Sequence, residues 1–356
     1  MSRSFPAGTT WTPPRRTCTS RSSTSGCRKC CAKRKAMMIS RIRIPTAVAG
    51  LLTCCMAWAQ QNQVQVEGAH YAMQQLPAMR FRAEGYDYDH EVLVALPATY
   101  NALPEKRYPV LWAMDGALLF DMTVGLAGFY AAGNRIPELI VVGVGHPSEE
   151  GLAGLAKRTV DLFPPGSSLS EPGPALDYLR DEMSEVGFEP DAVFANVKGD
   201  AFLAFLIDRL RPLLAEKYRM ADDHALFGHS AGGAFTGYAL LARPGAFDRY
   251  IIGSGTNGLS LTLEAEYAAE HDDLPARIFV GAGDLEANNL PMSAQRIVSR
   301  TVLFAENLLL RRYPSLALQT RLYRDRDHFD VLPIIIGDGL KWVYADAAEE
   351  LEPPLY

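Results

Sequence analysis

The sequence GHSAGG at residues 228–233 restricts most strongly what this chain can fold into. It follows the apolar run 225–227 and opens a helical pattern over 234–241, which places a G-x-S-x-G motif at a strand-to-helix turn. A serine in such a turn adopts a sparsely populated backbone conformation, and the flanking glycines avoid collisions across it. The helix that follows directs free N–H groups toward negative charge forming on the serine. This context predicts a nucleophilic Ser230; the alternative is an ordinary glycine-rich turn.

Around this turn, apolar runs that predict buried strands alternate with patterns that predict helices. We expect strands at 90–97, 108–114, 139–145, 225–227, 250–254, 276–281 and 318–323, and helices at 117–131, 202–218, 292–312 and 331–347. This alternation predicts an α/β fold with a mostly parallel, doubly wound sheet. No clear element is expected over 146–200, where turn residues recur, and an irregular insertion of that length is either a lid or binding loop or a solvated loop.

Charge and cysteine content divide the chain near residue 60. The first 60 residues hold 11 Lys and Arg and no Asp or Glu, which leaves 24 basic against 41 acidic residues in the body. An acidic body argues against nucleic acid or an anionic membrane surface as a partner. All six cysteines precede residue 56, so the body has no cysteine nucleophile. Cys27 and Cys30 are spaced like metal ligands, but no second pair lies nearby, and no metal site is expected.

The first 59 residues predict targeting and processing. Residues 1–36 lack apolar periodicity, and we interpret them as a disordered upstream extension that precedes the true start. Residues 37–59 combine a short basic region, an apolar run over 44–56 and an A-x-A site ending at Ala59, which is typical of a secretory signal peptide. Lipidation at Cys54 is an alternative. Residues 60–356 are then a single domain, periplasmic or secreted, without stable membrane insertion.

His328 is the candidate base, because a serine hydroxyl needs a base to take its proton. In open α/β sheets the ligand lies where strands end, and His328 follows the last expected strand. A solvated loop histidine is the alternative. The carboxylate that orients the base is expected after the strand ending near residue 281. Asp284 is favoured because it is nearer the strand end, Glu286 is the second candidate, and a serine–histidine pair without an acid is the third.

Backbone donors must hold the negative charge that forms on an attacked carbonyl oxygen. One is expected to be the N–H of Ala231, directly after the nucleophile, and the second the N–H of Gly116 or Ala117, after the strand at 108–114. No cofactor and no metal ion is needed, and no H-E-x-x-H spacing occurs. His229 lies next to the nucleophile and is interpreted as a packing residue.

With these residues placed, residues 65–346 resemble the putative-esterase family of α/β-hydrolases, most closely bacterial esterases that open siderophore trilactones of the enterobactin type. The likeness rests on the segments 108–116, 200–206, 213–218, 228–233 and 327–333. The resemblance implies an α/β-hydrolase fold and hydrolysis of a small-molecule ester. The chain departs from the family at 253–258, where Gly-Ser-Gly replaces a frequent Ser-Pro-Ser, which argues against aromatic stacking of a catecholate.

These features together predict an exported serine esterase that hydrolyses carboxylic esters through an acyl-enzyme. The ester is either a siderophore trilactone or a more general carboxylic ester. An acyltransferase to a sugar or lipid alcohol is the alternative, since it differs only in excluding water from the acyl-enzyme. A non-catalytic binding module that kept the fold is the other alternative.

Overall fold

A computed structural model describes residues 73–351 apart from 152, 168–173, 186, 290–291 and 349–350. The predicted upstream extension, the signal peptide and all six cysteines therefore lie outside the described residues, and those interpretations stay predictions. By its contacts the chain divides into Met1–Glu67 and Gly68–Tyr356, and the described residues all belong to the second unit.

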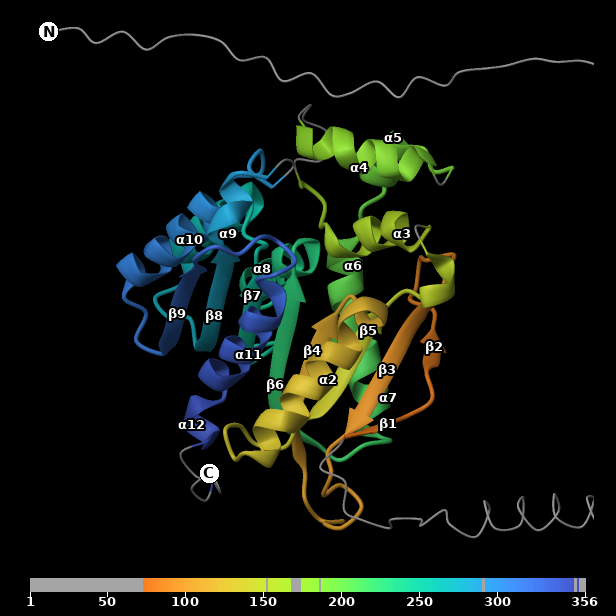
Figure 1. Cartoon of the computed structure of the whole chain (residues 1–356), viewed down its shortest axis with the longest axis vertical. Coiled ribbons are helices and arrows are strands. Elements are labelled where there is room, and N and C mark those ends of the chain that lie inside the picture. The colour runs from red at the N-terminus through yellow and green to blue at the C-terminus, as the bar shows by residue number, and fades with distance from the viewer. Residues whose placement is uncertain are drawn as a thin grey trace, which may run out of the picture. The chain divides into compact units, whose positions relative to one another are not determined.

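A mostly parallel sheet forms the centre of this second unit (Figure 1). Its hydrogen-bonded order is β1-β3-β5-β4-β6-β7-β8-β9, with β2 paired to β3. The strands β4 to β9 run parallel to one another, and β1, β2 and β3 add an antiparallel edge next to β5. The strands are β1 (Gln74–Gln75), β2 (Met79–Phe81), β3 (His90–Leu96), β4 (Tyr108–Met114), β5 (Ile140–Gly145), β6 (Met220–His229), β7 (Arg249–Gly253), β8 (Ala276–Gly283) and β9 (Leu316–Tyr323).

Helices cover both faces of the sheet, which places the core in two layers. One face packs against α2 (Gly116–Ala132) and α11 (Leu332–Val343), which lie in front of the strands in Figure 1. The other face packs against a second set of helices. These are α6 (Gly199–Ala204), η2 (Phe205–Leu210), α7 (Arg211–Ala215), α8 (Ala231–Ala242), α9 (Gly258–Glu270) and α10 (Ile297–Arg311), while α12 (Ala345–Ala348) follows α11.

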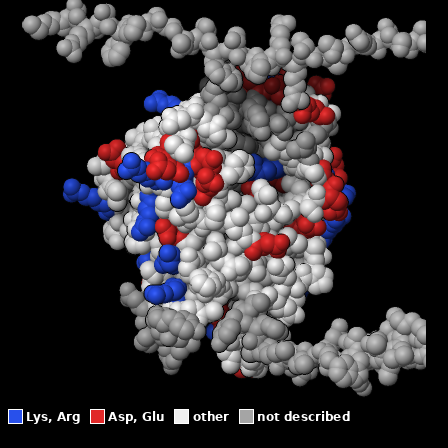
Figure 2. All heavy atoms as spheres, in the orientation of Figure 1, with Lys and Arg blue, Asp and Glu red and all other residues white. Residues whose placement is uncertain are grey.

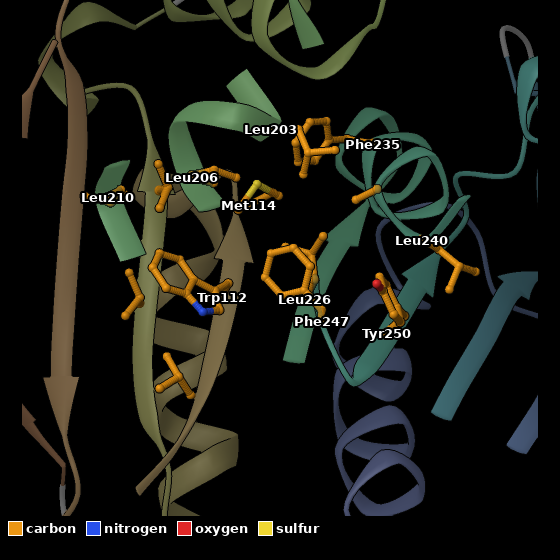
Figure 3. Packing of buried hydrophobic residues seen from close by; sticks show 14 of the residues in the cluster. Trp112, Met114, Leu203, Leu206, Leu210, Leu226, Phe235, Leu240, Phe247 and Tyr250 are labelled. Atoms are coloured by element: carbon orange, nitrogen blue, oxygen red, sulfur yellow. The ribbon is translucent and has the colours of Figure 1, made fainter. Parts of the chain in front are cut away.

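Trp112 and Leu226 show how the central strands build the second core layer. They are Cα partners on β4 and β6, both are buried, and they point to the same face of the sheet (Figure 3). Phe235 from α8 and Leu206 from η2 complete the packing above them. Because side chains alternate between the faces of a strand, an apolar run such as β4 supplies both layers at once.

The predicted α/β fold with a mostly parallel sheet is confirmed, and each expected strand and helix corresponds to an observed one. The expected helix over 202–218 corresponds to three consecutive helical segments, α6, η2 and α7, of which η2 is a π-helix. One expectation was wrong: residues 146–200 are not irregular. They contain η1 (Ser148–Glu150), α3 (Ala153–Leu162), α4 (Pro174–Glu185) and α5 (Pro190–Ala195), short helices separated by Pro- and Gly-containing joints that interrupt the apolar periodicity.

The outer side of α2 is apolar although it faces solvent. Leu118 and Phe129 are 75% and 73% exposed, and Met122 lies between them on the same side. Figure 2 shows few charged side chains over α2, whereas Lys, Arg, Asp and Glu gather over α9 and α10. No helix of the described residues is both long enough and apolar enough to cross a bilayer.

Candidate active site

Ser230 lies at the turn between β6 and α8 with φ 58° and ψ −122°, a conformation that costs a non-glycine residue about 1–3 kcal/mol. Its N–H donates to the Gly253 carbonyl at 2.8 Å, which holds the turn against β7. The neighbouring glycines are required by space: a Cβ on Gly228 would lie 2.0 Å from the Gly232 carbonyl oxygen, and one on Gly233 would lie 2.4 Å from that of Gly253. The motif therefore builds the strained turn expected from it.

The N-termini of α2 and α8 meet at this turn because their preceding strands, β4 and β6, are neighbours. A Cβ on Gly232 would lie 3.0 Å from Oδ2 of Asp115, the residue that precedes α2 and has φ 57°. The first N–H groups of a helix have no intrahelical acceptor. The structure thus places Ala231 and the Gly116–Ala117 pair, all three expected oxyanion donors, at two adjoining helix N-termini.

Arg158 is a charged residue at this site that the sequence reasoning missed. It lies on α3, and its Nη2 donates to Asp115 Oδ2 at 2.9 Å while its Nε donates to the other carboxylate oxygen. Burial lowers the pKa of Arg158, but the Asp115 carboxylate outweighs that effect and raises it. A fixed guanidinium therefore lies beside the α2 N-terminus. No local pattern signals this pair, because 43 residues separate its members.

His328 lies in the loop between β9 and α11 and is 5% exposed. His229 holds it from below: the Nε2–H of His229 donates to the main-chain carbonyl of His328 at 2.8 Å, and the two rings lie 4.5 Å apart. His229 therefore fixes the main chain at His328 by a hydrogen bond and is more than a packing residue. Among the described residues, the structure shows no hydrogen bond between the Ser230 hydroxyl and His328; such bonds often form only once substrate binds.

Glu286, not the favoured Asp284, faces the histidine. Glu286 is fully buried, and its Oε2 lies 3.7 Å from Nδ1 of His328, slightly beyond a hydrogen bond. Oδ1 of Asp284 is buried without a partner within the described part of the chain. η3 (Asp284–Ala287) begins directly after β8, and within it the Gly283 N–H donates to Oε1 of Glu286. The structure thus brings the second candidate beside His328, and the identity of the acid stays a prediction.

Three groups hold the Glu286 carboxylate in its ionised form. The Ser254 hydroxyl and the Gly283 N–H donate to its Oε1 at 2.7 and 3.2 Å. Burial raises the pKa of Glu286, but His328, Ser254 and the Gly283 N–H together outweigh burial and keep it below its usual range. Ser254 is a second site residue that was missed, although the Gly-Ser-Gly departure at 253–255 marked its position.

Glycine at 283 lets the loops after β8 and β9 touch. A Cβ there would lie 2.2 Å from the Arg326 carbonyl oxygen, and the Leu285 N–H donates to that same oxygen at 3.1 Å. This close approach brings Glu286 and His328 together from positions far apart in the sequence. Within the described ranges, no group of three or more His, Cys, Asp or Glu side chains is arranged to hold a metal ion.

Two buried histidines predict loss of stability in mild acid. Burial and the nearby His328 lower the pKa of His229 to about 3, and burial and Arg211 lower that of His224 to about 4. Below the unfolded pKa of about 6.5, the unfolded chain binds protons that the folded chain does not. We expect the free energy of unfolding to fall by about 2 kcal/mol per histidine between pH 7 and pH 5. Urea unfolding at both pH values measures this, and His224→Asn should remove about half of the decrease.

Comparisons with known proteins show what this chain is similar to. The family model described as putative esterase matches residues 181–305. The ferri-bacillibactin esterase BesA of Bacillus subtilis is 21% identical over 266 residues, which cover 71% of this chain and 84% of that protein. The siderophore triacetylfusarinine C esterase of Aspergillus fumigatus is 27% identical over 263 residues, covering 67% and 82%. These comparisons support an ester hydrolase.

A solved structure shows the same fold. The IroE-like serine hydrolase from Shewanella oneidensis superposes with a TM-score of 0.61 at 21% identity, covering 77% of this chain and 80% of that one. The sheet order, the turn at Ser230 and these likenesses lead to one conclusion. The chain has the α/β-hydrolase fold and resembles the putative-esterase family, with siderophore esterases among its relatives.

Proposed function

We propose that this protein is a serine esterase that hydrolyses carboxylic esters through an acyl-enzyme. The observation that carries the proposal is the position of Ser230. It stands in a strained turn at the head of α8, while the loops after β8 and β9 bring Glu286 and His328 to the same edge of the sheet. A nucleophile, an acid and a base in this order along the chain are the constellation of an α/β-hydrolase.

In the proposed reaction His328 takes the proton of the Ser230 hydroxyl as the oxygen attacks the ester carbonyl. Glu286 stabilises the imidazolium that forms and holds the ring with Nδ1 toward the carboxylate. The protonated His328 then donates to the departing alcohol. Water, deprotonated by the same histidine, attacks the acyl-enzyme and releases the acid.

The negative charge on the carbonyl oxygen falls between two helix N-termini. The N–H of Ala231 and that of Gly116 or Ala117 are the proposed donors, and a single such donor contributes about 2.7–4 kcal/mol to catalysis. The Arg158–Asp115 ion pair holds the residue that precedes α2 in place on that side of the site. The two helix N-termini favour a reaction in which negative charge develops on oxygen.

A siderophore ester is the substrate class that the named relatives support. We propose hydrolysis of such an ester in the periplasm or outside the cell, where the predicted signal peptide would direct the protein.

A panel of esters tests the proposal. It should include p-nitrophenyl acetate, longer aryl esters and siderophore trilactones with and without iron, with products identified by mass spectrometry. We expect free acid and free alcohol from at least one trilactone, at a kcat/KM well above that for p-nitrophenyl acetate. A competing alcohol in the assay is the control: if it captures most of the acyl group in place of water, the protein is an acyltransferase.

A further inference from the structure

Asp161 is a buried carboxylate on α3 that accepts hydrogen bonds from three side chains on two separate segments. The Tyr88 hydroxyl, in the loop before β3, donates to its Oδ1 at 2.7 Å. Its Oδ2 lies 3.1 Å from Nε2 of His90, the first residue of β3, and 2.8 Å from Nε2 of His146, directly after β5. Asp161 is 2% exposed, so this cluster joins α3 to the carboxyl edge of the sheet inside the protein.

The hydrogen-bond pattern assigns the protons in this cluster. Because both histidines point Nε2 at the same carboxylate oxygen, both must donate there. Their Nδ1 atoms are buried and have no partner among the described residues. Burial raises the pKa of Asp161, but the bonds from His146 and His90 outweigh it and hold that pKa below its usual value. The Asp161 carboxylate is therefore ionised and accepts from three donors. Breaking these hydrogen bonds would leave a buried charge without partners, which is energetically costly.

Arg158 lies three residues before Asp161, so both side chains project from the same side of α3. Asp161 attaches that side to β3 and β5, and Arg158 attaches it to Asp115 at the head of α2. Asp115 in turn touches the position where a Gly232 Cβ would stand, beside the nucleophile turn. The helix α3 thus links the buried cluster to Asp115, which lies beside the nucleophile turn.

We propose that Asp161 is a positioning residue: by fixing α3 to the sheet, it holds the Arg158 guanidinium against Asp115 and so keeps the α2 N-terminus in place beside Ser230. Asp161 touches no reacting atom and acts through Arg158. The proposal rests on the proposed esterase function, because its readout is ester hydrolysis. It also separates the insertion into two parts, since α3 belongs to the site while α4 and α5 contribute no contact to this cluster that the structure describes.

A double-mutant cycle on kcat/KM tests the inference. Asp161→Asn keeps the shape but removes the anion, and we expect kcat/KM to fall about tenfold to a hundredfold, the effect of misplacing a group by about 1 Å. In an Arg158→Gln background the same substitution should change kcat/KM by less than about twofold, because the residue through which it acts is gone. Arg243→Gln is the matched control: it removes an exposed ion pair with Asp208 that touches neither Asp161 nor Arg158, and it should leave kcat/KM unchanged.

A second pair of variants covers poor folding of Asp161→Asn. His146→Gln keeps a donor toward Asp161, whereas His146→Leu does not, so the glutamine variant should retain several times more activity at equal folded fraction. Full additivity of the Asp161 and Arg158 effects, or equal activity of the two His146 variants, would overturn the inference. If instead Ser230→Ala remained active, the esterase mechanism itself would fail, and the two failures are therefore distinct.

Discussion

Ser230→Ala is expected to abolish ester hydrolysis while the protein stays folded. Removing the nucleophile of such a constellation lowers kcat by several orders of magnitude, on the order of 10⁴ or more, since only the oxyanion donors and substrate binding remain. Alanine tolerates φ 58° about as poorly as serine does, so the free energy of unfolding should change by less than about 1 kcal/mol. Hydrolysis of p-nitrophenyl acetate and urea unfolding measure the two effects.

A fluorophosphonate probe gives the matching chemical test. The wild-type protein should gain one adduct by intact mass, and peptide mapping should place it on Ser230. Ser299→Ala is the control, because Ser299 is exposed on α10 and its hydroxyl bonds only within its own helix turn. That variant should keep both labelling and turnover. An adduct on folded Ser230→Ala protein, or undiminished hydrolysis by it, would contradict the assignment.

Glu286→Gln should have the second largest effect. The substitution keeps the size of the side chain but removes the charge that stabilises protonated His328, and it leaves an amide beside the imidazole. In a serine triad the corresponding change lowers kcat by about 10⁴. Since the distance to Nδ1 is 3.7 Å in the free protein, we expect a loss of about 10²–10⁴ in kcat, measured at pH 7 on the same ester.

Asp284→Asn is the natural control, because it makes the same chemical change two residues away. Asp284 does not face His328, so this variant should stay within about threefold of the wild type. A large loss for Asp284→Asn with none for Glu286→Gln would restore the preference drawn from the sequence. Indifference to both substitutions would instead favour a serine–histidine pair that works without an acid.

The contribution of Glu286 to folding stability should be lost only in strong acid. Its pKa is lowered below about 4.5, so its contribution to stability is present above that value and is lost as pH falls through the folded pKa. Proton uptake by the unfolded chain at His224 and His229 lowers the stability progressively from about pH 6.5 down to their folded pKa values of about 4 and 3. Of these two effects, only that of the histidines acts between about pH 6.5 and 4.5, and Glu286 adds to the decrease below that range.

Features that depend on neighbours in the sequence could be predicted from the sequence. The apolar runs at 108–114 and 139–145 give buried strands because a strand flanked by helices buries both faces. The strained turn at Ser230 requires the glycines around it, since a larger residue would collide with the backbone there. The expected place of His328 follows from a general rule, because parallel strands all end at the same edge of a sheet.

Features that depend on contacts between distant segments were decided only by the tertiary structure. The choice between two acids two residues apart turned on the η3 turn and on a 2.7 Å bond from Ser254, which lies 32 residues away. Arg158 and Asp161 showed no local signal at all, because their partners lie on other strands and helices. The alternation of apolar and polar residues determines which elements form; which side chains meet depends on how loops close over the end of the sheet, and that is a property of the whole fold.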